Sequence, residues 1–260
     1  MNVFILTDLE GIPGVTSIDC MERGSSENLE ARRLLTHWLN KTAEYCRAYG
    51  AETVYYLDGH GGGGNIDECD VDPSLIRITL ADWSQLMSEG KIDCQIELGA
   101  HARAGTLGGF LDHTISSKGI FSITFNGREY SELALHAVLC GAYGVPIVAC
   151  IGDLTACEQA KEYIPKIETG VVKVASCRNC CEDLPDADRI IRETVGRALK
   201  NYKSIPPFSF ELPAIIEQTF YRTDMCESAL KKQDGTVTRI SARTLQKTVG
   251  RIDSYFDLRI

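Results

Sequence analysis

The first eleven residues constrain the fold more than any other stretch of the chain. Residues 3–6 (Val-Phe-Ile-Leu) are apolar and predict a buried strand of a parallel sheet. Asp8 and Glu10 follow two residues apart, and Gly11 begins a sharp turn. Because strand side chains alternate with a period of two, both carboxylates can leave the strand end on one side. Open α/β sheets bind ligands at such ends, although a helix cap and a solvated glutamate would also explain the pair.

Segments with strand and helix character alternate along most of the chain. Apolar runs predict strands at residues 53–57, 75–80, 94–98, 121–125, 145–151 and 171–175, and helical spacing predicts helices at 26–49, 129–143 and 187–202. This alternation predicts an α/β fold, a mainly parallel sheet flanked by helices in three layers. The linker-like residues 204–207 (Ser-Ile-Pro-Pro) separate an α/β domain, residues 1–203, from a smaller C-terminal lobe, residues 204–260. Within that lobe we expect a strand at 208–220 and a helix at 241–255.

Charge and composition exclude several classes of protein. The 260 residues carry a formal net charge of −9, which argues against partners such as nucleic acid or an anionic membrane surface. No apolar run is long enough to span a bilayer, and no secretory signal pattern is visible at the N-terminus. Eleven cysteines, an odd number in a chain of this length, fit reduced thiols better than a disulfide framework. We therefore expect a cytoplasmic protein.

One cysteine cluster needs separate consideration. Cys177, Cys180 and Cys181 form a CxxC motif with an extra cysteine. A structural zinc site would need a second pair at ligand spacing, and a redox motif normally opens a helix. Neither condition is met, so the sequence leaves the role of these three residues open.

Three histidines lie beyond predicted strands. His60 ends the strand at 53–57 and is followed by four glycines, which fit neither a dinucleotide-binding fingerprint nor a P-loop. His101 comes just after the strand at 94–98, and His113 lies on the loop beyond it. His60, at a strand end within a glycine loop, is a candidate ligand on its own, and His101 occupies a similar position. A loop histidine such as His113, taken alone, is more often exposed to solvent than catalytic. His37 and His136, on predicted helices, are expected to be structural or exposed.

The strand-end residues become informative as a set. Parallel strands end at one edge of a sheet, so Asp8, Glu10, His60 and His101 should converge there. Imidazole with carboxylate suits zinc, and manganese or iron less sharply. Glu132, in the first turn of a predicted helix, either favours the helix dipole or joins the set. These ligands exceed the needs of one tetrahedral zinc, whereas two zinc ions sharing a carboxylate would use them all. Asp8, nearest the strand end, is the natural bridge, and a bridging hydroxide would bring the cluster to neutrality.

The order and spacing of these motifs resemble those of a known family. The chain is similar to the D-aminopeptidase family of dinuclear zinc metallopeptidases, peptidase family M55. The resemblance covers most of the first 160 residues and continues weakly beyond them. It rests on Thr7-Asp8-Leu9-Glu10-Gly11-Ile12, Asp58-Gly59-His60, Gly99-Ala100-His101-Ala102-Arg103-Ala104, the loop of His113, Asn126-Gly127 and Ser131-Glu132.

The resemblance implies a role for each metal ligand. Asp8 would bridge two zinc ions per subunit, Glu10 and His60 would complete one site, and His101 and Glu132 would complete the other. It also implies a ring-like homo-oligomer that encloses its active sites.

The resemblance further implies that His113 is the catalytic histidine. The reaction we expect is aminopeptidase hydrolysis of the N-terminal residue of short peptides, some containing D-amino acids, by a metal-bridging hydroxide. A two-metal phosphoesterase would use the same ligands but normally needs extra cations, and Arg103 is the only obvious one in these loops. A non-catalytic metal-binding ring is the remaining alternative.

Overall fold

A computed structural model describes all residues from 1 to 260. Its larger sheet has seven strands in the order β3-β2-β1-β4-β7-β8-β9, and only β9 runs antiparallel to its neighbour. These strands are β1 (Asn2–Thr7), β2 (Thr53–Asp58), β3 (Ile76–Arg77), β4 (Cys94–Ala100), β7 (Ile147–Asp153), β8 (Glu168–Cys177) and β9 (Cys180–Asp183). The predicted α/β fold is therefore confirmed.

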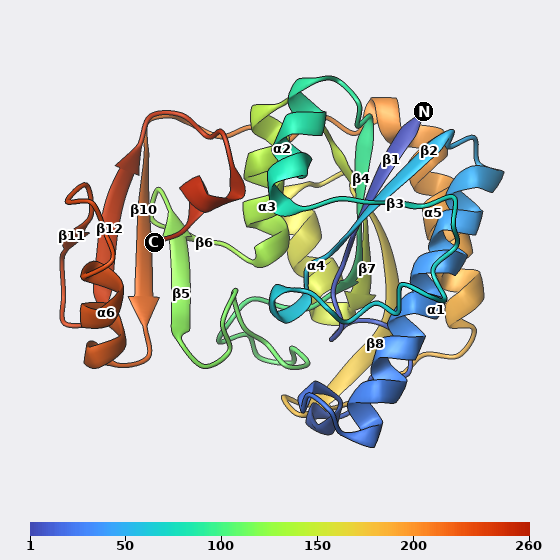
Figure 1. Cartoon of the computed structure of the whole chain (residues 1–260), viewed down its shortest axis with the longest axis horizontal. Coiled ribbons are helices and arrows are strands. Elements are labelled where there is room, and N and C mark those ends of the chain that lie inside the picture. The colour runs from blue at the N-terminus through green and yellow to red at the C-terminus, as the bar shows by residue number, and fades with distance from the viewer.

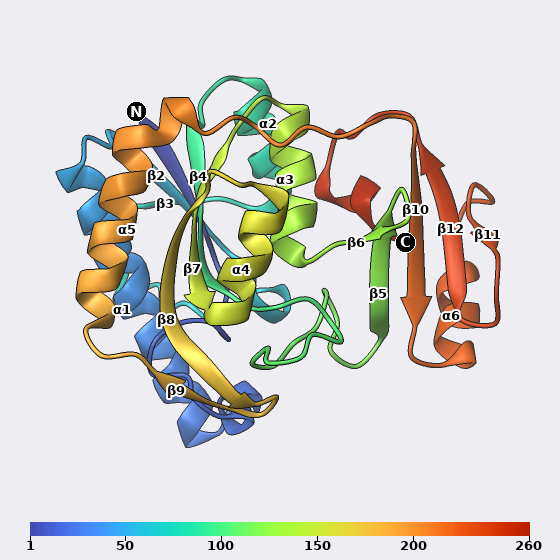
Figure 2. The same ribbon diagram turned by 180° about the vertical axis from the view of Figure 1, so that it is seen from behind.

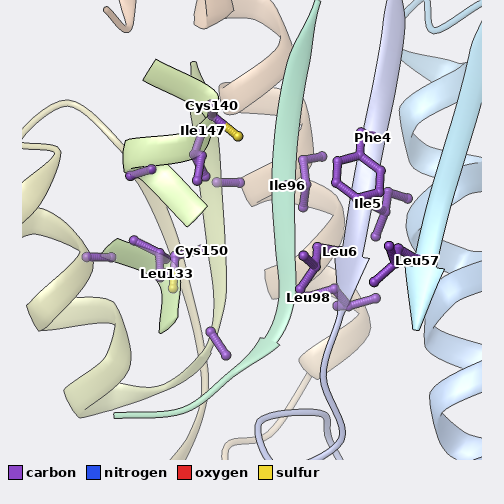
Figure 3. Close-up of a cluster of buried hydrophobic side chains, with 14 of the residues drawn as sticks. Phe4, Ile5, Leu6, Leu57, Ile96, Leu98, Leu133, Cys140, Ile147 and Cys150 are labelled. Atoms are coloured by element: carbon purple, nitrogen blue, oxygen red, sulfur yellow. The ribbon is translucent and has the colours of Figure 1, made fainter. Parts of the chain in front are cut away.

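Helices cover both faces of this sheet (Figures 1 and 2). One face carries α1 (Ser26–Ala48) and α5 (Ala187–Asn201), and the other carries α2 (Leu80–Ser88), α3 (Glu132–Ala142) and α4 (Leu154–Tyr163). The sheet therefore forms the middle of three layers, as predicted. In β4 and β7 every residue is buried, as two covered faces require. Figure 3 shows the result, with Phe4 and Ile5 of β1 packed near Ile96 of β4.

Several predicted boundaries were wrong for local reasons. The predicted strand at 75–80 shrinks to Ile76–Arg77, because Thr79 caps α2 and its hydroxyl accepts a hydrogen bond from Asp82 N (3.2 Å). The predicted helix at 129–143 begins only at Glu132, because Ser131 is its N-cap and Glu129 pairs in a strand.

The second sheet is antiparallel and has five strands in the order β11-β12-β10-β5-β6. They are β11 (Thr238–Arg239), β12 (Thr244–Val249), β10 (Ala214–Phe220), β5 (Ile120–Phe125) and β6 (Arg128–Glu129), with α6 (Thr223–Leu230) beside them. The helix predicted at 241–255 was wrong. Thr244, Thr248 and Val249 are β-branched and pair along β10, so a partner strand overrides the helical spacing.

The chain crosses between the two sheets more than once. After β4 it leaves the larger sheet through residues 101–119, forms β5 and β6, and returns through α3 (Figure 1). The smaller sheet thus combines residues 120–129 with the C-terminal region, while the division at residue 204 stays a prediction about folding units. A short 3-10 helix, η4 (Tyr255–Leu258), packs back against α3. None of the helices combines the length and apolar character needed to cross a bilayer.

Candidate metal centre

Three neighbouring strands deliver the acidic and imidazole side chains to one edge of the larger sheet. Asp8 and Glu10 follow β1, His60 follows β2 in the 3-10 turn His60–Gly62, and His101 follows β4. The strands are parallel and in direct register, with Thr7 opposite both Asp58 and Leu98. The first loop is bound to its neighbour by hydrogen bonds from Asp8 N to Leu98 O (2.8 Å) and from Gly11 N to Gly99 O (2.9 Å).

Asp8 lies between two histidines. His60 Nδ1 is 3.1 Å from Asp8 Oδ1 and 2.9 Å from Glu10 Oε2. His101 Nε2 is 3.3 Å from the other oxygen, Asp8 Oδ2, and 3.3 Å from Glu132 Oε1. Each oxygen of Asp8 therefore faces a different histidine, and each histidine has a second carboxylate of its own.

His113 reaches the same centre from the loop between β4 and β5. Its Nδ1 lies 2.8 Å from Leu111 O, which fixes the proton on that nitrogen and turns Nε2 inward. Nε2 is 3.9 Å from Glu10 Oε1 and 3.7 Å from Glu132 Oε1. The loop is held against Glu132, because Ile115 N donates a hydrogen bond to Glu132 Oε1 (2.7 Å). All six residues that the sequence singled out thus gather within one cluster.

The donor set fits a metal. Glu10, His101 and His113 form one group of possible ligands, and Asp8 appears in two more, with Glu10 and His60 and with His101 and Glu132. His101 Nδ1 lies 2.9 Å from Ala102 O, which leaves the buried Nε2 free to act as a ligand. Nε2 of His101 is buried close to the carboxylates of Asp8 and Glu132 but has no hydrogen-bond partner. A buried nitrogen without a partner is what a metal ligand would show in the absence of its metal.

Burial and charge shift the protonation of these groups in opposite directions. Burial works to lower the pKa of His60, but the charge of Glu10 and hydrogen bonds to Asp8 and Glu10 raise it to about 11. Burial works to raise the pKa of Glu132, yet His101 brings it down to about 2. In the same way, Asp8 and Glu132 raise the pKa of His101 against the effect of burial. The two histidines hold the pKa of Asp8 well below its ordinary value. Without a metal, the carboxylates around His60 and His101 therefore favour the protonated forms of these two histidines.

The sequence did not reveal the residues that support the ligands. Lys173 is buried in β8, and its Nζ donates to Glu10 O (3.0 Å), which fixes the first loop. Its only signal is a lysine within an apolar strand. Arg178, at the tip of the β8–β9 hairpin, accepts a hydrogen bond at its carbonyl from Leu111 N (2.7 Å), and its side chain lies 3.0 Å from Asp112. Arg178 and Asp112 are too far apart in sequence for any local pattern to link them.

The two remaining histidines and the cysteine motif lie outside the cluster. His136 is packed as one alternative foresaw, with Nδ1 3.0 Å from Glu97 Oε1, and His37 is exposed. Cys177 and Cys180 lie opposite each other across the β8–β9 hairpin, whose tip contacts the loop of His113. The cysteine motif therefore sits beside the site without joining the cluster.

Comparison with known proteins identifies the family to which this chain belongs. A family model described as D-aminopeptidase (Peptidase_M55) matches residues 1–258. A D-aminopeptidase of Bacillus subtilis (strain 168) is 30% identical over 220 residues, which are 80% of this chain and 77% of that protein. The structure of the Zn-dependent D-aminopeptidase DppA from Bacillus subtilis, a self-compartmentalizing protease, has a TM-score of 0.91 to this one. That alignment covers 99% of this chain and 95% of the other at 23% identity, so it shows a common fold. Because the family model spans nearly the whole sequence, the chain belongs to the D-aminopeptidase family.

Proposed function

We propose that this protein is a zinc-dependent aminopeptidase that removes the N-terminal residue of short peptides, including peptides with D-amino acids. Membership of the D-aminopeptidase family supports the reaction, and the zinc dependence of the structural neighbour supports the metal. The preference for D-residues rests on the names of the family and of the Bacillus subtilis relative.

The proposed centre holds two zinc ions per subunit. Asp8 is the shared ligand, Glu10 and His60 complete one site, and His101 and Glu132 complete the other. The observation that carries this assignment is that the two oxygens of Asp8 face different histidines. A single tetrahedral zinc would leave ligands of this set unused.

Zinc held there would polarise a peptide carbonyl and lower the pKa of a water molecule. The protein supplies the rest. His113 directs Nε2 at the centre while Leu111 O holds its other nitrogen, so its imidazole is positioned to exchange a proton with the reacting amide or to stabilise charge on its oxygen. The free amine of an N-terminal residue would bind to a zinc ion or to one of the carboxylates of the cluster.

The assembly and its location are also proposed. A ring-like homo-oligomer is supported by the structural neighbour, which is a self-compartmentalizing protease. A cytoplasmic location is supported by eleven free cysteines, most of them buried.

Metal analysis combined with a substrate panel tests the function. The purified protein, saturated with zinc, should contain two equivalents per subunit and should hydrolyse D-alanyl-D-alanine. The panel includes the L,L dipeptide and a generic phosphate ester. Turnover of the ester alone would overturn the proposal in favour of a phosphoesterase, and about one zinc equivalent would overturn the paired site.

A further inference from the structure

A cavity of about 680 Å³ opens beside the metal centre. Asp8 and Glu132 form part of its wall, and the C-terminal segment supplies Tyr255 and Arg259. Tyr255 begins η4, which packs against α3, the helix that starts with Glu132 (Figure 1). The C-terminal segment, far from the ligands in sequence, thus borders the same cavity as the metal centre.

Arg259 is the cation of this cavity that has no acidic partner. The other arginine in its wall, Arg77, is 2.9 Å from Glu68 and so is already paired. No carboxylate lies within 4.0 Å of the Arg259 guanidinium. That group lies instead over two aromatic rings, 5.0 Å from the centroid of Phe256 and 5.4 Å from that of Tyr255.

The main chain around Arg259 is fixed, which positions the side chain. Lys247 Nζ donates to Arg259 O (2.7 Å), and the next residue, Ile260, donates from its N to Gln218 Oε1 (3.0 Å). Tyr255 is buried between the two charged regions. Burial, and then the charge of Glu132, raise its pKa, whereas Arg259 acts to lower it. The buried ring of Tyr255 is therefore close enough to both Glu132 and Arg259 for their charges to affect it.

We infer that Arg259 binds the C-terminal carboxylate of a short peptide substrate. A guanidinium offers two parallel N–H groups to a carboxylate, and the aromatic rings leave that edge available. Asp8, Glu132 and Arg259 line one cavity whose volume lies in the range of small-molecule sites, so a short peptide bound in it can contact both regions. Its amino end would lie at the end of the cavity that Asp8 and Glu132 form. This inference rests on the proposed peptidase function, and it makes the substrates free di- and tripeptides rather than the N-termini of long chains.

The test compares D-alanyl-D-alanine with its C-terminal amide, which lacks the negative charge. Steady-state kinetics are measured for the zinc-loaded wild type, Arg259→Gln and Arg259→Lys. Arg251→Gln, an exposed arginine paired with Asp253, is the matched control. We expect the wild type to prefer the free acid by about 10- to 100-fold in kcat/KM, which is what charge-assisted hydrogen bonds supply. Arg259→Gln should lose that preference mainly through KM, with the amide unaffected, and Arg259→Lys should recover part of it.

Three results distinguish a failure of the carboxylate-binding inference from a failure of the proposed peptidase function. Equal losses on acid and amide in Arg259→Gln would mean that the arginine only supports the fold and would overturn the inference. So would a wild type that does not distinguish the two peptides while hydrolysing both. If neither peptide is hydrolysed, the proposed function fails. Calorimetric binding of the same two peptides to the wild type and to Arg259→Gln then tests, independently of catalysis, whether Arg259 binds a carboxylate. A preference for the acid that only the wild type shows would support that site, and equal binding would reject it.

Discussion

The imidazole rings of His101 and His113 are stacked, with centroids 4.0 Å apart and planes 7° apart. Each ring directs Nδ1 to a main-chain oxygen and Nε2 to the carboxylates, yet their surroundings differ. His101 Nε2 is buried between Asp8 and Glu132, whereas His113 Nε2 stays about half an ångström farther from its carboxylates. This difference supports the proposal that His101 binds metal while His113 acts on the substrate.

Replacing His113 should separate metal binding from catalysis. His113→Ala is expected to keep both zinc equivalents and to lower kcat by about 100-fold or more, because a positioned acid–base group contributes that much. Metal analysis and steady-state kinetics on a dipeptide check this. His37→Ala, an exposed histidine on α1, is the control and should change neither value. Loss of one zinc from the His113 variant would make this residue a ligand instead.

The two carboxylates of the first loop should not be equivalent. Asp8→Asn weakens contacts to both His60 and His101, so both zinc ions are expected to be lost or bound much more weakly. Glu10→Gln should mainly weaken the site of His60. Competitive zinc titration with a chelator measures the two affinities, and Glu193→Gln on α5 serves as the control. Equal, mild losses from Asp8→Asn and Glu10→Gln would contradict a shared aspartate.

The strand-end residues were predictable because parallel strands end at a common edge. That geometry requires only the recognition of three apolar runs, and it placed Asp8, Glu10, His60 and His101 together. His113 and Glu132 were different. Their positions depend on the path of residues 101–131 out to the smaller sheet and back, which no local period encodes, and only the family resemblance singled out His113.

The smaller sheet was even harder to predict from local sequence. Residues 120–125 pair with 216–220, so the paired residues lie between 91 and 100 positions apart in the sequence. Strand pairing of this kind is decided by tertiary contacts, so the segment 244–249 was mistaken for part of a helix. The supporting contacts of Lys173 and Arg178 were missed for the same reason, because each joins segments that only the fold brings together.

Zinc binding should release protons and strengthen as pH rises. In the metal-free protein the pKa of His60 is about 11 and that of His101 is also raised, so both imidazoles are protonated at pH 7. Zinc requires their neutral forms, so at least two protons should leave on binding, and a hydroxide formed from a zinc-bound water would add one more. Calorimetry in buffers of different ionisation enthalpy counts them. His60→Gln should reduce the count by about one, and a wild type that releases none would contradict these protonation states.

Gly11 is expected to be required for the first loop to pack. A Cβ at this position would lie 2.2 Å from Ala100 O, and no flexible side chain is available to move aside. Gly11→Ala should therefore lower the free energy of unfolding of the metal-free protein by about 2 to 3 kcal/mol and reduce zinc content. Gly250→Ala, where nothing lies within 4 Å of the new Cβ, is the control. Urea unfolding measures the free energy of unfolding of both variants. Equal values for Gly11→Ala and Gly250→Ala would contradict a steric requirement for glycine at position 11.

Arg178 should position His113 without binding metal or substrate. Its side chain lies 3.0 Å from Asp112 and donates to Asp112 O (3.3 Å), next to the histidine. Because Arg178 is 44% exposed, loss of this ion pair should cost less than about 1 kcal/mol of stability. Catalysis is more sensitive, since small displacements of a reacting group carry large rate penalties.

Arg178→Ala should therefore lower kcat by about tenfold while the free energy of unfolding and the zinc content stay near those of the wild type. Arg189→Ala, an exposed arginine whose side chain pairs along α5, controls for the loss of surface charge. The effect should vanish in a His113→Ala background, because the arginine acts through that histidine. An undiminished tenfold loss in the double variant would show that Arg178 acts on the substrate by another route.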